Sequence, residues 1–130
     1  MAKILVIEDE DTLRTLVSGI LTDAGYEVIE AADAPSGFAA AAARKPDLIL
    51  SDFIMPGVLG VPDKNLFEVL SSDPRTKNIP IIIVSALPKE TIRSNTPERL
   101  WPRILSKPFD YFHLDAVIAD VLKQNESSNG

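Results

Sequence analysis

The sequence predicts an α/β fold in which a parallel sheet is covered by helices on both faces. Short apolar runs alternate with segments whose apolar residues recur at helical spacing. Most of these runs are continuously hydrophobic, as in strands that are buried on both faces. Right-handed crossovers would join such strands into one doubly wound sheet.

Five segments are expected to be strands because each is short, apolar and bounded by turn or helix signals. The segment after the first helix carries two glutamates, which suits an edge strand. The expected strands are Ile4–Ile7, Tyr26–Glu30, Asp47–Ser51, Ile79–Val84 and Arg103–Ser106.

The expected helices follow from apolar spacing, capping residues and breakers. Gly25 is expected to end the first helix, Asp33 to cap the second, Asp73-Pro74 to end the third, and Asp110 to cap the last. The apolar positions of the first helix are Leu13, Leu16, Val17, Ile20, Leu21 and Ala24, those of the last are Leu114, Val117, Ile118, Val121 and Leu122, and the shorter helices are expected at Asn65–Ser72 and Lys89–Asn95.

Length and composition fit one domain, expected over residues 1–125, with a polar C-terminal tail at 126–130. A net charge of −6 with scattered Lys and Arg argues against a nucleic-acid or anionic-membrane surface. The absence of Cys excludes a disulfide framework, a thiolate nucleophile and a Cys-ligated metal. No apolar run is long enough to span a bilayer and no signal peptide is evident, so a cytoplasmic protein is expected.

Charged residues stand where several of the expected strands end. Asp52 follows Leu48–Ser51, Glu8 and Asp9 follow the first strand, and Lys107 follows the fifth. Asp52 is not expected in the core, because a buried unpaired charge costs several kcal/mol. Parallel strands bring their carboxyl ends to one edge of a sheet, which is where such folds bind ligands. The sequence therefore predicts a site at this edge.

The residue types at that edge favour phosphoryl chemistry. Close carboxylates raise one another's pKa, and a hard cation such as Mg²⁺ relieves their repulsion. Lys107 adds an ammonium, and Ser85, after the fourth strand, adds a hydroxyl donor. Asp52 would be the nucleophile that forms an aspartyl phosphate.

Taken singly, these residues also have ordinary structural roles. Asp9 and Asp11 would serve as caps of the first helix, Ser85 as a turn hydroxyl and Lys107 as a solvated lysine. Only their convergence on one edge favours a functional site.

Four segments in this order resemble the receiver domain of two-component response regulators, as in single-domain chemotaxis-type regulators. They are Ile4–Glu10, Ser51–Gly57, Pro80–Ala86 and Ser106–Phe109. The resemblance covers essentially the whole chain. It implies a flavodoxin-like fold, a doubly wound five-stranded parallel sheet of order 2-1-3-4-5.

The resemblance also implies the roles of the site residues. Asp52 would be the phosphoacceptor. Asp9, assisted by Glu8, would hold Mg²⁺ together with the Asp52 carboxylate and the main-chain carbonyl of Ile54. Ser85 and Lys107 would bind the phosphoryl group. The implied partners are a histidine kinase or histidine phosphotransfer protein and a downstream protein target or output domain, and a homodimer is also compatible with the resemblance.

Three features depart from the usual receiver pattern. Ile104 stands where receivers usually carry an aromatic switch residue, and the loop after Met55-Pro56 is longer than usual. The segment Pro97–Pro102 replaces the usual fourth helix and the loop after it, so the region around helix 4 is expected to be atypical.

Three functions compete. The first is a phosphorylation-dependent switch that acts through protein contacts and is not an enzyme in its own right. The second is a receiver-like binding module that is not phosphorylated. The third, a phosphatase of the haloacid dehalogenase type, needs Asp-x-Asp-x-Thr/Val, whereas Leu13 ends the corresponding segment that begins at Asp9. The chain is also too short for that family's cap and further motifs.

Overall fold

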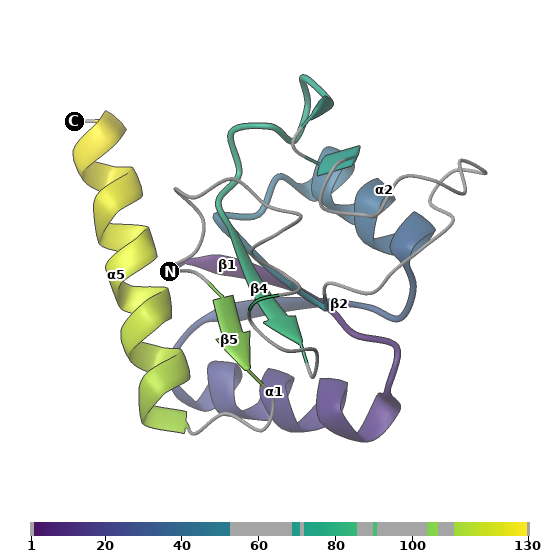
Figure 1. Cartoon of the computed structure of the whole chain (residues 1–130), viewed down its shortest axis with the longest axis vertical. Helices are drawn as coiled ribbons and strands as arrows, with labels where there is room; N and C mark the ends of the chain where they lie inside the picture. Colours follow the sequence, from purple (N-terminus) through teal and green to yellow (C-terminus); the bar gives the residue numbers. More distant parts are fainter. Residues whose placement is uncertain are drawn as a thin grey trace.

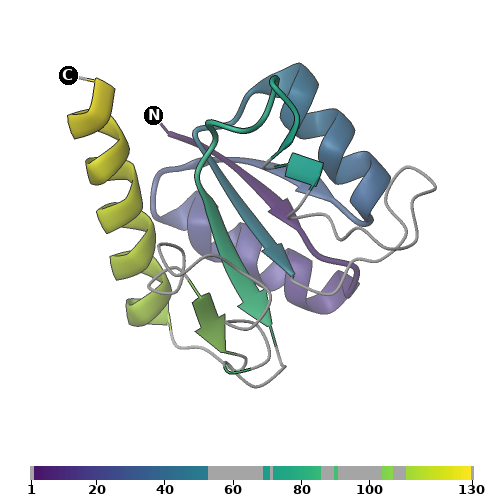
Figure 2. The same cartoon turned by 45° about the horizontal axis from the view of Figure 1, so that its top comes forward.

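The computed structural model describes residues 2–52, 69–70, 72–85, 90, 104–106 and 111–129. Parallel strands form a five-stranded sheet of order β2-β1-β3-β4-β5, and Figures 1 and 2 show them running in the same general direction. The predicted doubly wound sheet and its strand order are confirmed. The elements are β1 (Lys3–Ile7), α1 (Asp11–Asp23), β2 (Glu27–Ala31), α2 (Ala34–Arg44), β3 (Leu48–Asp52), β4 (Ile81–Ser85), β5 (Ile104–Ser106) and α5 (Tyr111–Asn129).

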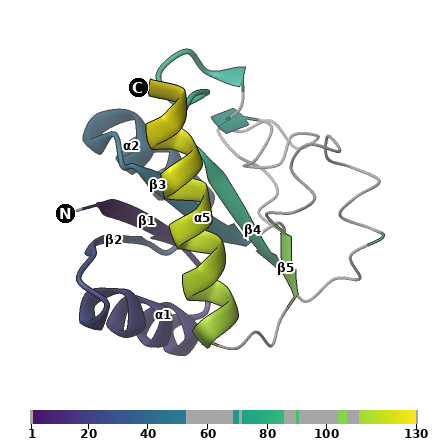
Figure 3. The same cartoon turned by 90° about the vertical axis from the view of Figure 1, so that its left-hand side faces the viewer.

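Helices cover the sheet on both faces, α2 on one and α1 and α5 on the other (Figures 1 and 3). Each central strand supplies both cores because its side chains alternate between the two faces. In β1, Leu5 and Ile7 pack in the core on the α2 side, with Phe38, whereas Ile4 and Val6 pack on the α1 and α5 side. The strands expected to be buried on both faces are therefore confirmed as such.

Local capping explains where the first two helices begin and end. Gly25 has a φ of +100°, a conformation that glycine adopts readily, and it follows the α1 C-cap residue Ala24. Asp33 caps α2, since its Oδ1 accepts a hydrogen bond of 2.8 Å from the main-chain N–H of Ser36. This bond lowers the pKa of the Asp33 carboxyl below its ordinary value.

Several boundaries differ from the predicted ones by one or two residues, as expected where only the hydrogen-bond ladder decides the end of a strand. Helix α5 continues to Asn129, through most of the predicted polar tail. Leu16 lies on the apolar stripe predicted for α1, yet it is 58% exposed. Val17 and Leu21 of the same helix are buried.

Several predicted features lie outside the described residues. These include the loop after Pro56, nearly all of the expected Lys89–Asn95 helix, and the atypical Pro97–Pro102 segment. Of the expected Asn65–Ser72 helix, residues 69, 70 and 72 are described and are helical, and turns follow from Asp73 onward. Within the described part of the chain, no helix is long and apolar enough to cross a membrane.

Candidate functional site

The main chains of three predicted site residues come to one edge of the sheet. Ile7 pairs with Ser51, so the residues that follow them, Glu8 and Asp52, come next to each other along neighbouring strands. Asp52 in turn pairs with Val84, the residue before Ser85. Ser85 pairs with Ser106, the residue before Lys107. The strand register thus brings the main chains of Glu8, Asp52 and Ser85 to the carboxyl edge.

Glu8 is a buried acid at this edge, with an exposed fraction of only 6%. Its main-chain N–H donates to the carbonyl of Ala31 at 3.1 Å, which extends the β1–β2 ladder by one bond. Its Oε2 accepts a bond of 3.3 Å from the main-chain N–H of Glu10. Both interactions hold Glu8 at the end of β1.

Asp9 is exposed, and its carboxylate makes no hydrogen bond or ion pair with the described part of the chain. The capping role considered for Asp9 and Asp11 is not observed. Glu10 is the N-cap residue of α1, and its side chain makes no capping bond. Asp11 instead pairs with Arg14, at 2.5 Å between Oδ1 and Nη2.

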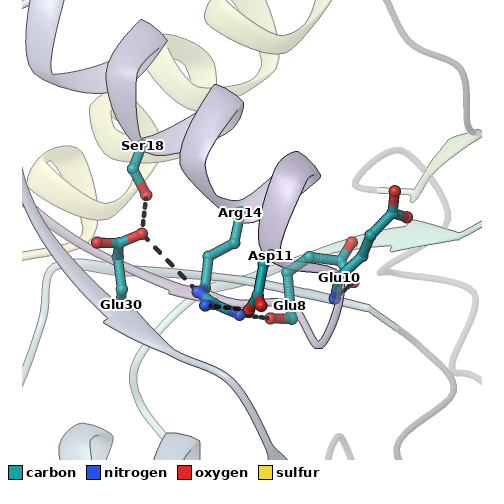
Figure 4. Close-up of polar contacts among 6 residues, drawn as sticks. All are labelled: Glu8, Glu10, Asp11, Arg14, Ser18 and Glu30. Carbon is teal, nitrogen blue, oxygen red and sulfur yellow. Dashed lines mark hydrogen bonds and ion pairs between the residues drawn. The ribbon is translucent and has the colours of Figure 1, made fainter.

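Arg14 of α1 is a basic residue beside the acidic segment Glu8–Asp11, and the sequence analysis did not identify it. Figure 4 shows its guanidinium between Glu30 of β2 and the segment that leads into α1. Nη1 donates to the carbonyl oxygen of Glu8 at 2.8 Å, and Nε lies 3.8 Å from Oε1 of Glu30. The available signal was a lone arginine three residues after Asp11, a spacing that brings side chains together on a helix.

A small hollow lies beside Glu8, on the face of the sheet that α1 covers. Its lining consists of apolar side chains from β1, β3, β4 and α1, together with Glu8 and Ser51. An apolar surrounding strengthens electrostatic interactions and penalises unpaired charge. At the carboxyl edge, the buried apolar lining of this hollow therefore lies close in the chain to an exposed carboxylate, that of Asp9.

The remaining site predictions fall on parts that the structure does not describe. Ile54 and Lys107 lie outside the described residues, and only the main chain is described for Asp52, Ser85 and Ile104. Among the described side chains, no group of three or more acids, histidines or cysteines gathers as a metal site would require. The described candidates for a metal are thus Glu8 and Asp9, and their predicted third carboxylate is that of Asp52.

The response regulator receiver domain model matches residues 4–119, nearly the full chain. The chain belongs to the response regulator receiver domain family. This result confirms the resemblance inferred from the four motifs, and receivers of this family act as signalling switches.

This receiver is similar in sequence to several curated proteins. It is 35% identical to the response regulator PleD of Caulobacter vibrioides over 98% of its own length and 29% of that protein. It is 35% identical to the phosphate regulon transcriptional regulatory protein PhoB of Pseudomonas aeruginosa, over 93% of its length and 52% of PhoB. The chain thus spans about half or less of these two relatives. Protein PilH of the same organism is 32% identical, over 85% of this chain and 88% of PilH.

Solved structures agree on the fold. The chemotaxis response regulator CheY4 of Vibrio cholerae superposes with a TM-score of 0.74 at 29% identity, covering 93% of this chain and 98% of that one. A response regulator from Desulfuromonas acetoxidans gives a TM-score of 0.83 at 23% identity, over 95% and 98% of the two chains. The second likeness shows the shared fold alone.

Proposed function

We propose that Asp52 of this receiver accepts a phosphoryl group and that its phosphorylation switches contacts with another protein. The observation that carries the proposal is the strand register. It supports a site made from Asp52, Glu8, Asp9, Ser85 and Lys107, because all of these positions stand at or directly after the carboxyl ends of neighbouring strands. The receiver family of the chain supports the same assignment.

In the proposed step, a carboxylate oxygen of Asp52 attacks the phosphorus of a phosphohistidine on the donor protein. The new O–P bond gives an aspartyl phosphate, and the P–N bond breaks with its electron pair going to the imidazole nitrogen. Ser85 would donate its hydroxyl hydrogen to a phosphoryl oxygen. Lys107 would offset the added negative charge with its ammonium group.

The acids at the end of β1 fit a hard divalent cation. Glu8 is a buried carboxylate and Asp9 an exposed one, and oxygen donors of this kind are those that Mg²⁺ prefers. We assign Glu8, Asp9, Asp52 and the main-chain carbonyl of Ile54 as the groups that would hold Mg²⁺. The ion supplies positive charge against the phosphoryl oxygens when it is bound.

The proposed partners are a histidine kinase or histidine phosphotransfer protein as donor, and a downstream protein or output domain as target. A homodimer is a further proposed partner arrangement. The proposed location is the cytoplasm, and the net charge of −6 supports the absence of direct nucleic-acid or membrane contacts. The relative PhoB is named a transcriptional regulatory protein, and this chain covers 52% of it. Transcriptional regulation is therefore a property of that protein and is not proposed for this chain.

Incubation with acetyl phosphate and Mg²⁺, read by intact-protein mass spectrometry, tests the proposed function. Wild-type protein is expected to gain the mass of one phosphoryl group, and Asp52→Asn is expected to gain none because it lacks the nucleophilic oxygen. Withholding Mg²⁺ is expected to suppress the gain in the wild type.

Asp47→Asn is the matched control for this experiment. Asp47 lies at the opposite end of β3, where Oδ2 accepts a bond of 2.7 Å from the main-chain N–H of Lys3, and asparagine retains an acceptor oxygen there. The control is expected to be phosphorylated as the wild type is. No mass gain in wild-type protein would instead favour the receiver-like binding module.

A further inference from the structure

We propose that Arg14 is a positioning residue that holds the Glu8–Asp11 segment in the geometry needed for Mg²⁺ binding. The inference rests on the proposed function, since it gives the segment its role as part of the metal site. Arg14 would not contact the metal or the phosphoryl group. It would act through the main chain and side chains that its guanidinium holds.

On one side, the Arg14 guanidinium contacts the segment at two points, and the main chain of Arg14 adds the first hydrogen bond of the helix. Its Nη1 donates to the Glu8 carbonyl at 2.8 Å, and its Nη2 pairs with Asp11 Oδ1 at 2.5 Å. Its main-chain N–H donates to the carbonyl of Glu10 at 2.9 Å. Asp9 thus lies between Glu8 and Glu10, which are joined by the hydrogen bond from Glu10 N–H to Glu8 Oε2 and which both contact Arg14.

On the other side, Arg14 is anchored to β2. Its Nε lies 3.8 Å from Glu30 Oε1, and the same oxygen accepts a bond of 3.0 Å from the Ser18 hydroxyl of α1 (Figure 4). The Arg14 side chain is 17% exposed and that of Glu30 is 48% exposed, so water screens their ion pair in part. The guanidinium therefore links the acidic segment to β2 through Glu30.

The contacts of Arg14 matter for this segment because α1 begins without a side-chain N-cap. A side-chain cap commonly fixes the first turn of a helix, but the α1 N-cap residue Glu10 makes no capping bond with its side chain. Arginine suits the task, since its planar fork presents several N–H donors in fixed directions. A lysine at this position would keep the positive charge and lose the fork.

Charge and geometry predict opposite effects on metal affinity. A cation beside the acidic segment repels Mg²⁺, so removing its charge alone would strengthen Mg²⁺ binding. Loss of a residue that orients metal ligands typically weakens metal binding by about 10–100-fold. The sign of the change therefore decides whether Arg14 acts by position or only by charge.

The test compares wild type, Arg14→Gln and Arg14→Lys by two measurements. Titration calorimetry is expected to show Mg²⁺ binding about tenfold weaker in both variants. Hydrogen exchange of the metal-free proteins is expected to be faster in both variants at the amides of Glu10 and Arg14, which donate to Glu8 Oε2 and to the Glu10 carbonyl. Arg75→Gln is the matched control, because Arg75 is also paired with an acid, Asp73, but lies in the turn before β4. It is expected to match the wild type in both measurements.

Several results would overturn the proposal. They are tighter Mg²⁺ binding by Arg14→Gln, wild-type affinity in Arg14→Lys, and unchanged exchange at the amides of Glu10 and Arg14 in either variant. A wild-type protein that binds no Mg²⁺ would overturn the proposed metal site and Arg14's role in it together. Wild-type binding with unaltered variants would overturn the role of Arg14 alone, so the two failures are distinguishable.

Discussion

Asp9→Asn is expected to weaken Mg²⁺ binding to this receiver by at least about tenfold, which is the lower end of what loss of even an indirect partner of a metal ligand costs. The substitution removes the charge of an exposed carboxylate that has no partner among the described residues. Acetyl phosphate-dependent phosphorylation at limiting Mg²⁺ is expected to fall in parallel. Calorimetric titration with Mg²⁺ measures the first effect directly.

Glu10→Gln provides the matched control for Asp9→Asn. Glu10 is the next residue along the chain, is also exposed, and makes no capping bond with its side chain. If Asp9 is a ligand, Asp9→Asn weakens Mg²⁺ binding far more than Glu10→Gln does. Glu10→Gln is expected to act only by removing one negative charge, whose effect on Mg²⁺ is screened by water. Equal losses in the two variants would show that Asp9 contributes only general negative charge.

Gly37→Ala is expected to destabilise the fold by about 1–2 kcal/mol, although alanine favours helices by about 0.5–1 kcal/mol over glycine. A Cβ at position 37 of α2 would lie 2.6 Å from Cδ1 and 2.9 Å from Cγ1 of Ile7, the last residue of β1. Ile7 is 1% exposed and has little room to yield, and overpacking of this kind costs about 1–3 kcal/mol. Urea unfolding measures the loss.

Gly19→Ala is the control for Gly37→Ala. A Cβ at position 19 of α1 would meet nothing within 4 Å, so alanine is expected to stabilise the protein by about 0.5–1 kcal/mol. Combining Gly37→Ala with Ile7→Val removes the closest atom and is expected to cost less than the sum of the two single changes. Stabilisation by Gly37→Ala alone would contradict the close packing of α2 against β1.

The apolar pattern predicted the sheet well because a strand that is buried on both faces requires apolar residues at consecutive positions. β1 is a clear case, since Ile4 to Ile7 are all almost fully buried. Asp33 was predictable for a similar reason, because an acid just before a helix-forming run satisfies free N–H groups. In both cases a local rule and the tertiary structure require the same residue.

Where local and tertiary requirements differ, the sequence was a poorer guide. Leu16 has the spacing of a buried residue, but the tertiary packing of α1 leaves it exposed. Arg14 gave only a weak signal, because its role depends on Glu30, a residue on a different strand that helical spacing cannot place beside it. The roles of Asp52, Ser85 and Lys107 stay predictions, supported by strand register and family.

Localising the phosphoryl group to one residue tests the central claim most directly. Wild-type protein treated with acetyl phosphate and Mg²⁺ is reduced with borohydride, which converts an acyl phosphate to the corresponding alcohol, and is then digested for peptide sequencing by mass spectrometry. We expect homoserine at position 52 and no alcohol product at Glu8, Asp9 or Asp11. Reduction at another acid, or a phosphorylated protein in which position 52 remains aspartate, would contradict the account.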